Sequence, residues 1–253
     1  SRQVLPFSTG VIGEQLPFEK ILVALPMLYE ALSADAWQSA AQGILTTDTR
    51  PKLASTSFTA NGSQANISGF AKGSGMIRPN MATLLAYVFA DAKIETPLLE
   101  NFLDSAVNNS FNRITVDGDT STNDCCMLVA TGKGSLVITD ADSEAARQFQ
   151  SELNAVFEQL ATDLIRDAEG ASKFITIEVN EGASEQECLA VAYTVAESPL
   201  VKTAFFASDP NWGRILAAIG RAGLSDLDIE SVTVALGDTL IVSKGAVDAE
   251  YSE

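Results

Sequence analysis

The sequence contains no histidine, and this absence restricts the chemistry open to the protein. Without an imidazole, Ser-His-Asp and Cys-His catalysis are excluded, and so are metal sites built on histidine. A catalytic base would then have to be a carboxylate, a lysine, a tyrosine or a free α-amine. An α-amine has a pKa of about 7.7–8.0, which suits general-base catalysis at neutral pH.

Cysteine, basic residues and long apolar runs are also scarce. The three cysteines, Cys125, Cys126 and Cys188, form no CxxC pair, so we expect no zinc or other metal site and buried thiols in a reducing, cytoplasmic setting. Only 16 Lys and Arg face 33 Asp and Glu, and a net charge of −17 argues against binding to nucleic acid or anionic membrane surfaces. No apolar run approaches the roughly 20 residues that cross a bilayer.

The remaining composition favours a folded protein of mixed architecture. Hydrophobic residues make up 46% of the 253 residues, enough for a sizeable core in one large domain or two modest ones. Helical and strand patterns are interspersed without a regular βαβ rhythm, so we expect mixed α/β structure as a layered sandwich, not a doubly wound parallel sheet. The patterns predict helices at 18–32 with a kink at Pro26, 34–45, 97–109, 143–167, 184–197 and 212–221, and strands at 55–60, 63–70, 83–90, 125–131, 174–179 and 231–236.

Two polar segments have residue types found in calcium-binding and phosphate-binding loops, but the spacing of these residues does not fit either kind of site. Residues 117–123 alternate oxygen-bearing side chains like an EF-hand loop, but Thr122 replaces the glycine and Leu128 replaces the final glutamate. A loop held by local hydrogen bonds is the better account. The glycines around Lys72 match neither common phosphate-binding motif.

Thr83 stands out because it follows a loop rich in Gly, Pro and Asn and begins an apolar run. From spacing alone, such a threonine is usually structural. In a histidine-free enzyme, however, an N-terminal threonine can use its own α-amine to accept its hydroxyl proton. Self-cleavage of the Ala82–Thr83 bond, through an N→O acyl shift and ester hydrolysis, would produce that N-terminus.

Several motifs in a fixed order make the chain similar to a known family. They lie at 4–14, 46–49 (Thr46-Thr-Asp-Thr49), 71–76 (Ala71-Lys-Gly-Ser-Gly-Met76), 79–83 (Pro79-Asn-Met-Ala-Thr83), 110–124 and 209–214. Together they resemble the ornithine acetyltransferase family of arginine biosynthesis, also called glutamate N-acetyltransferase. The resemblance covers almost the whole chain.

The resemblance implies a role for individual residues. The family cleaves itself at an Ala–Thr bond, which falls at Ala82–Thr83 here, and the new N-terminal threonine is the nucleophile. An oxyanion hole is implied at Thr9 and Gly10. Substrate binding is implied at Thr46, Lys72, Thr83 and Glu181, the last because it precedes Gly-Ala.

The resemblance also implies substrates and an assembly. Thr83 would take the acetyl group from N-acetylornithine and pass it to glutamate, with no cofactor and with acetyl-CoA as a further donor in some members. Residues 1–82 and 83–253 would belong to two fragments that assemble as a heterotetramer. An asparagine and a threonine that complete the family's substrate site near its C-terminus have no counterpart in these 253 residues.

Two other functions remain open at this point. An N-terminal-nucleophile hydrolase or aminopeptidase would use the same threonine but pass the acyl group to water. An inactive, truncated homologue would keep the motifs without cleavage or transfer.

Overall fold

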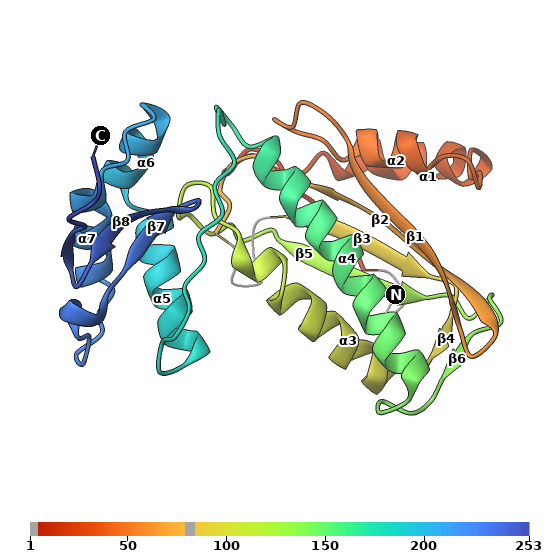
Figure 1. Cartoon of the computed structure of the whole chain (residues 1–253). Coiled ribbons are helices and arrows are strands. Elements are labelled where there is room, and N and C mark those ends of the chain that lie inside the picture. The colour runs from red at the N-terminus through yellow and green to blue at the C-terminus, as the bar shows by residue number, and fades with distance from the viewer. Residues whose placement is uncertain (1–4, 79–83, 253) are drawn as a thin grey trace. The chain divides into compact units, whose positions relative to one another are not determined.

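The computed structural model describes residues 5–78 and 84–252, in two compact units, Ser1–Ala171 and Ser172–Glu253. Within the described residues, no helix is long and apolar enough to cross a membrane. The expectation of mixed α/β structure is confirmed (Figure 1). The predicted division of the chain at 82/83 lies outside the described residues and stays a prediction.

The first unit combines a sheet with helices (Figure 1). Its elements are α1 (Phe18–Glu30), α2 (Trp37–Gly43), β1 (Lys52–Ala60), β2 (Ser63–Lys72), β3 (Leu85–Ala90), β4 (Lys93–Ile94), α3 (Thr96–Asn108), the 3-10 helix η1 (Phe111–Arg113), β5 (Cys125–Ala130), β6 (Val137–Ile138) and α4 (Glu144–Arg166). The main sheet has the order β1-β2-β3-β5. Its first two pairs are antiparallel and the β3–β5 pair is parallel, so the sheet is not of the doubly wound type.

The β1–β2 hairpin follows directly from the sequence. Asn61 and Gly62 both have positive φ, 49° and 73°, as a two-residue type I′ turn requires. The turn sets the register, which pairs Ala60 with Ser63 and runs to Lys52 and Ala71. Lys52 and Lys72 therefore lie at the same end of the sheet, far from the turn.

Helix α4 provides the core that holds this sheet in place. Ser143 caps its first turn by accepting a hydrogen bond from the amide of Ala146. Apolar side chains at helical spacing, among them Phe149, Leu153, Phe157 and Leu160, are fully buried. They form one cluster with the inward-facing residues of the strands and with α3, so one face of the sheet is covered by helices.

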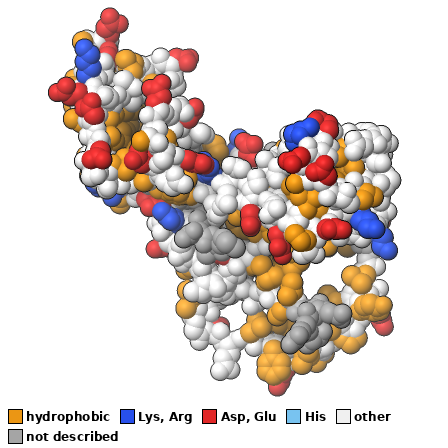
Figure 2. All heavy atoms as spheres, turned by 90° about the horizontal axis from the view of Figure 1, so that it is seen from below, with side chains coloured by type: hydrophobic (Ala, Val, Ile, Leu, Met, Phe, Trp, Pro, Cys, Tyr) orange, Lys and Arg blue, Asp and Glu red, His pale blue; other side chains and the backbone are white. Residues whose placement is uncertain are grey.

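The N-terminal helices are much more exposed. Helix α1 has no buried residue, although most of its side chains are apolar. Pro26 lies inside it, as expected. In α2, by contrast, Trp37 packs edge-on against Phe70 and Phe89 of the sheet. Figure 2 shows acidic side chains dispersed over the visible face, with hydrophobic side chains also reaching the surface there.

The second unit has its own small core. Its elements are α5 (Glu185–Ala196), α6 (Pro199–Phe206), α7 (Trp212–Gly220), the 3-10 helix η2 (Ile229–Ser231), β7 (Val234–Leu236), β8 (Thr239–Ser243) and β9 (Ala246–Val247), with sheet order β7-β8-β9. The predicted strand at 174–179 is wrong, because this segment has no ladder partner among the described residues. Its alternation instead reflects one-sided packing, with Ile177 and Val179 against the unit's apolar cluster.

Candidate active site

Two residues assigned to substrate by the resemblance meet at the end of β2. The Lys72 ammonium donates a hydrogen bond to the Thr46 hydroxyl at 2.7 Å. Lys72 is the last residue of β2, and Thr46 lies in the segment between α2 and β1, 26 residues away. The structure therefore brings Thr46 and Lys72 together.

Two opposing effects act on the charge of Lys72, namely its burial and the attraction of a nearby carboxylate. Burial lowers the pKa of Lys72, and the attraction of Asp48, whose Oδ2 is 3.7 Å from Nζ, opposes that decrease. An ammonium has three N–H donors, and a short hydrogen bond to Thr46 occupies one. Asp48 is the carboxylate that faces the ammonium from the protein side.

Asp124 is a second, half-buried ionisable group near Lys72. Burial raises the pKa of Asp124 to about 7, and the attraction of Lys72 works in the opposite direction. Its Oδ2 is buried and has no hydrogen-bond partner among the residues that the structure describes. Within the described part of the chain, this carboxyl is therefore the group best placed to hold a proton at neutral pH.

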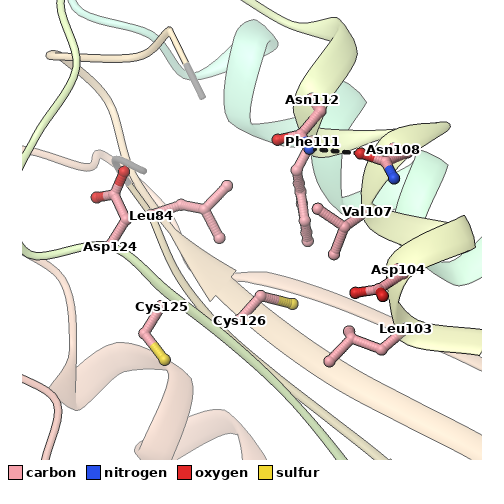
Figure 3. Close-up of a pocket in the computed structure, with 10 residues that line it drawn as sticks. All are labelled: Leu84, Leu103, Asp104, Val107, Asn108, Phe111, Asn112, Asp124, Cys125 and Cys126. Atoms are coloured by element: carbon pink, nitrogen blue, oxygen red, sulfur yellow. Dashed lines mark hydrogen bonds between the residues drawn. The ribbon is translucent and has the colours of Figure 1, made fainter. Parts of the chain in front are cut away.

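Asp124 lies at the edge of a small cavity between α3, η1 and the beginnings of β3 and β5 (Figure 3). The cavity has a volume of about 180 Å³, and its walls include Leu84, Val107, Phe111 and Cys126. Figure 3 shows the Cys126 sulfur directed toward Val107, whereas the Asp124 carboxyl lies at the far edge. Burial raises the pKa of the Cys126 thiol strongly, so this thiol stays protonated and unreactive.

The polar loop before β5 has the local hydrogen bonds expected from its sequence, and it also has bonds to the distant Met76–Ile77 segment. Asp117 accepts from the amides of Met76, Ile77 and Asp119, so its carboxylate is committed to the backbone. Ser121 accepts from the amide of Asn123. The loop thus anchors the backbone at Met76 and Ile77.

Thr9 and Gly10 follow directly on a segment that contacts strand β3 and the loop before β5. Asn123 donates to the carbonyl of Ser8 at 3.1 Å, and the Phe7 ring contacts Tyr87 of β3. Among the described residues, no atom lies within 4 Å of the position that a Cβ would take on Gly10. The backbone at the predicted oxyanion hole is therefore open to a ligand.

The structure does not test the roles of the remaining predicted residues. Ala82 and Thr83 lie outside the described residues, so their assignment stays a prediction. Leu84, which follows Thr83, is buried, and its carbonyl accepts from the amide of Cys125 at 2.8 Å. Glu181 belongs to the second unit, is exposed and has a φ of 62°.

A different glutamate lies beside the site, and sequence reasoning missed it. Glu169 also precedes Gly-Ala, so the motif occurs twice and the sequence alone cannot choose between the two. The Glu169 amide donates to the carbonyl of Ser74 at 2.8 Å. A Cβ on Gly75 would stand 2.9 Å from the Glu169 carboxyl carbon, so this exposed carboxylate lies directly against the Lys72–Gly75 segment.

Comparison with known proteins decides the family. A sequence model described as "ArgJ family" matches residues 1–253. The chain belongs to the ArgJ family. The arginine biosynthesis bifunctional protein ArgJ of Pseudomonas fluorescens is 55% identical over 252 residues, and that of Methylococcus capsulatus is 57% identical over 251 residues. Each match covers 99% of this chain and 62% of the relative, so the chain spans less than two thirds of their length.

A solved structure of the same family agrees with the fold. The crystal structure of ArgJ from Bacillus halodurans has a TM-score of 0.59 at 37% identity. The match covers 64% of this chain and 75% of that one. These findings confirm the resemblance from which the roles of Thr46, Lys72 and Thr83 were inferred.

Proposed function

We propose that the chain transfers the acetyl group of N-acetylornithine to glutamate, with Thr83 as the nucleophile. The relatives named above are arginine biosynthesis proteins described as bifunctional, which supports this substrate class. The observation that carries the proposal is the Thr46–Lys72 pair at the end of β2. In the β2–β3 register Lys72 pairs with Leu85, only two residues after Thr83 in the chain.

The chemistry begins with self-cleavage. The Thr83 hydroxyl attacks the carbonyl carbon of Ala82, the peptide C–N bond breaks, and an ester forms on the Thr83 oxygen. Water then hydrolyses this ester, which frees the carboxyl group of Ala82 and the α-amine of Thr83. Because the sequence has no histidine, we propose this amine as the base that activates the nucleophile.

Acetyl transfer then proceeds in two steps. The Thr83 oxygen attacks the acetyl carbon of N-acetylornithine while the Thr83 amine accepts its proton. Amides of Thr9 and Gly10 would stabilise the tetrahedral oxyanion. The C–N bond breaks, ornithine leaves with the proton, and glutamate later attacks the acetyl ester to give N-acetylglutamate. Acetyl-CoA could acylate the same oxygen in the bifunctional reaction.

Charged groups at the site suit an amino-acid substrate. Lys72 would bind the substrate carboxylate, and Thr46 would orient the Lys72 ammonium. For the amino group of ornithine we propose Glu169 in place of Glu181, because the Glu169 carboxylate lies against Gly75, in the segment that carries Lys72.

The two cleavage products are expected to stay together. Strands β1 and β2 precede the cut and β3 and β5 follow it, yet all four belong to one sheet. Six residue pairs, from Ile67–Ala90 to Lys72–Leu85, join the two sides of the cut. We propose that this sheet and its α3–α4 layer form part of a larger layered sandwich and that two copies of each fragment assemble as a heterotetramer, which size-exclusion chromatography of the cleaved protein would test.

The test combines intact mass with an acetyl-transfer assay on the wild-type protein, Thr83→Ala and Thr83→Ser. We expect wild type to be cut between residues 82 and 83 and to acetylate glutamate, Thr83→Ala to do neither, and Thr83→Ser to retain part of both. Cleavage or transfer by Thr83→Ala would refute the nucleophile. Acetyl release that does not depend on glutamate would indicate a hydrolase, and an uncut, inactive wild type would indicate an inactive homologue.

The two glutamates provide a matched comparison within this assay. We expect Glu169→Gln to raise the KM for N-acetylornithine at least about tenfold, since a charged hydrogen bond of about 1.5–3 kcal/mol is lost. Glu181→Gln should change it little. The reverse result would restore Glu181 to the substrate site.

A further inference from the structure

A buried ionic cluster lies directly beneath Lys72, and the family motifs assign no role to its central residue. The Lys52 side chain is fully buried, as is that of Asp48. Its ammonium donates to Asp48 and, at 2.5 Å, to Asp167, and it lies 3.4 Å from the carbonyl of Gly73. With Lys72 beside Asp48, the cluster contains two cations and two anions.

Asp48 connects Lys52 to the segment that binds substrate. Its Oδ1 accepts from the amide of Gly73 at 2.7 Å, and its Oδ2 accepts from the amide of Thr46 at 3.2 Å. Burial alone would raise the pKa of Asp48, but the hydrogen bonds from Lys52, Gly73 and Thr46 lower it below its usual 3.8. Asp48 therefore stays ionised and fixes the backbone on both sides of the Lys72–Thr46 contact.

Asp167 connects Lys52 to the segment that carries Glu169. Its carboxylate accepts from both the amide and the hydroxyl of Thr49, while its backbone carbonyl accepts from the Ser74 hydroxyl at 2.9 Å. Ser74 in turn accepts from the amide of Glu169 through its own carbonyl. Lys52 is thus connected to Lys72 through Asp48, and to the segment of Glu169 through Asp167.

Stability does not explain why this cluster is charged. Removing ions from water costs several kcal/mol each, and well-packed apolar groups of similar volume often stabilise a protein as much or more. A charged cluster has directional contacts that an apolar cluster lacks. It therefore fixes the relative positions of the segments that it joins more strictly than apolar packing would.

We propose that Lys52 and Asp167 are positioning residues that fix the separation between the Lys72 ammonium and the Glu169 carboxylate, and so set the length of amino acid that the site accepts. This inference rests on the proposed function, in which those two groups bind the carboxylate and the amino group of one substrate. A fixed separation suits ornithine and discriminates against its homologue with one more methylene. In a hydrophobic pocket, one methylene typically changes kcat/KM by about 10–200-fold.

The experiment measures kcat and KM of the intact protein for N2-acetylornithine and for N2-acetyllysine. Asp167→Asn keeps the shape and the acceptor for Thr49 but removes the charge that Lys52 contacts. Lys52→Arg keeps the charge and changes its geometry. It is the variant to measure if Asp167→Asn does not fold. Arg50→Ala is the matched control, because Arg50 joins the same two segments through an exposed ion pair with Asp163 at 3.3 Å.

In Asp167→Asn we expect the KM for N2-acetylornithine to rise about tenfold, with kcat changed much less, and the preference over N2-acetyllysine to fall about tenfold. Lys52→Arg should shift both quantities in the same direction, and Arg50→Ala should shift neither. If both cluster variants lower only the thermal midpoint, or weaken both substrates equally, the cluster is structural and the proposal is wrong. If wild type transfers no acetyl group from N2-acetylornithine, the proposed function fails and this inference fails with it.

Discussion

The main sheet of the first unit has two regions of opposite character. Beneath α4 lies an apolar layer, in which Ile67, Phe157 and Leu160 are fully buried. At the strand ends lies the ionic cluster, formed by Asp48, Lys52, Lys72 and Asp167, which is buried almost as completely. Both regions are packed against the same strands, but one is held by non-directional burial and the other by directed charge contacts.

The difference between these regions leads us to expect a division of labour, in which the apolar layer determines stability and the ionic cluster determines substrate preference. Apolar burial contributes free energy in proportion to area and tolerates small displacements. Charged contacts contribute little net stability but depend sharply on distance and angle. We therefore expect substitutions in the apolar layer to change stability and leave substrate preference intact, and substitutions in the cluster to change substrate preference.

The largest expected effect on stability comes from Leu160→Ala. Leu160 lies in the C-terminal half of α4 and is fully buried in the apolar layer, so we expect a loss of about 3 kcal/mol in the free energy of unfolding. The KM for N-acetylornithine should not change at temperatures where the variant is folded. Urea denaturation and steady-state kinetics measure the two quantities.

The control for this variant is Glu158→Ala, on the exposed side of the same helix. It should change the unfolding free energy by no more than about 0.5 kcal/mol. A raised KM in Leu160→Ala would show that the apolar layer also positions the site, and the proposed division of labour would not hold.

Sequence patterns predicted the apolar layer because its contacts are mostly repeated at regular spacing. The periodicity of α4, the Asn61-Gly62 turn and the apolar runs of β3 and β5 each report local geometry. The error at 174–179 shows the limit of such patterns. Alternation reports that one side of an extended segment is covered, but it does not report whether a neighbouring strand exists.

The ionic cluster could not be predicted in the same way. Lys52 and Asp167 are separated by 115 residues, and nothing in the local sequence of either marks it as buried. Resemblance to the family located Thr46 and Lys72, which the structure places in contact. It led to Glu181 because that residue precedes Gly-Ala, but Glu169 precedes Gly-Ala as well, and the fold shows that Glu169 lies beside Gly75.

A smaller effect is expected from Asp124→Asn, and it appears in the pH dependence of stability. Because burial raises the pKa of Asp124 to about 7, the folded protein retains a proton that the unfolded chain releases near pH 3.8. The free energy of unfolding should therefore fall as pH rises through this interval. The Asn variant should lose this part of the fall, which urea midpoints at pH 5 and pH 8 would show against wild type.

The contribution of the cluster carboxylates to stability depends on pH in the opposite direction. Burial raises the pKa of Asp48 and Asp167, but hydrogen bonds, first from Lys52, lower both below 3.8, so their stabilising contribution is lost only when pH falls below that value. Asp104→Asn, at an exposed position on the wall of the same cavity as Asp124, controls for the loss of one formal charge. An Asp124→Asn midpoint that follows wild type at both pH values would contradict the assignment of a retained proton to Asp124.

The smallest expected effect on the free energy of unfolding gives the sharpest test of the difference between the apolar layer and the ionic cluster. Ile67→Val removes one methyl group from the centre of β2 and should lower the free energy of unfolding by about 1 kcal/mol, without changing the preference for N2-acetylornithine over N2-acetyllysine. Asp167→Asn alters even less volume, yet it should change that preference. Both variants act on the same sheet, so a general loosening of the fold would affect the preference in both. If Ile67→Val relaxed the preference as much as Asp167→Asn, packing rather than charge geometry would set the length of the substrate.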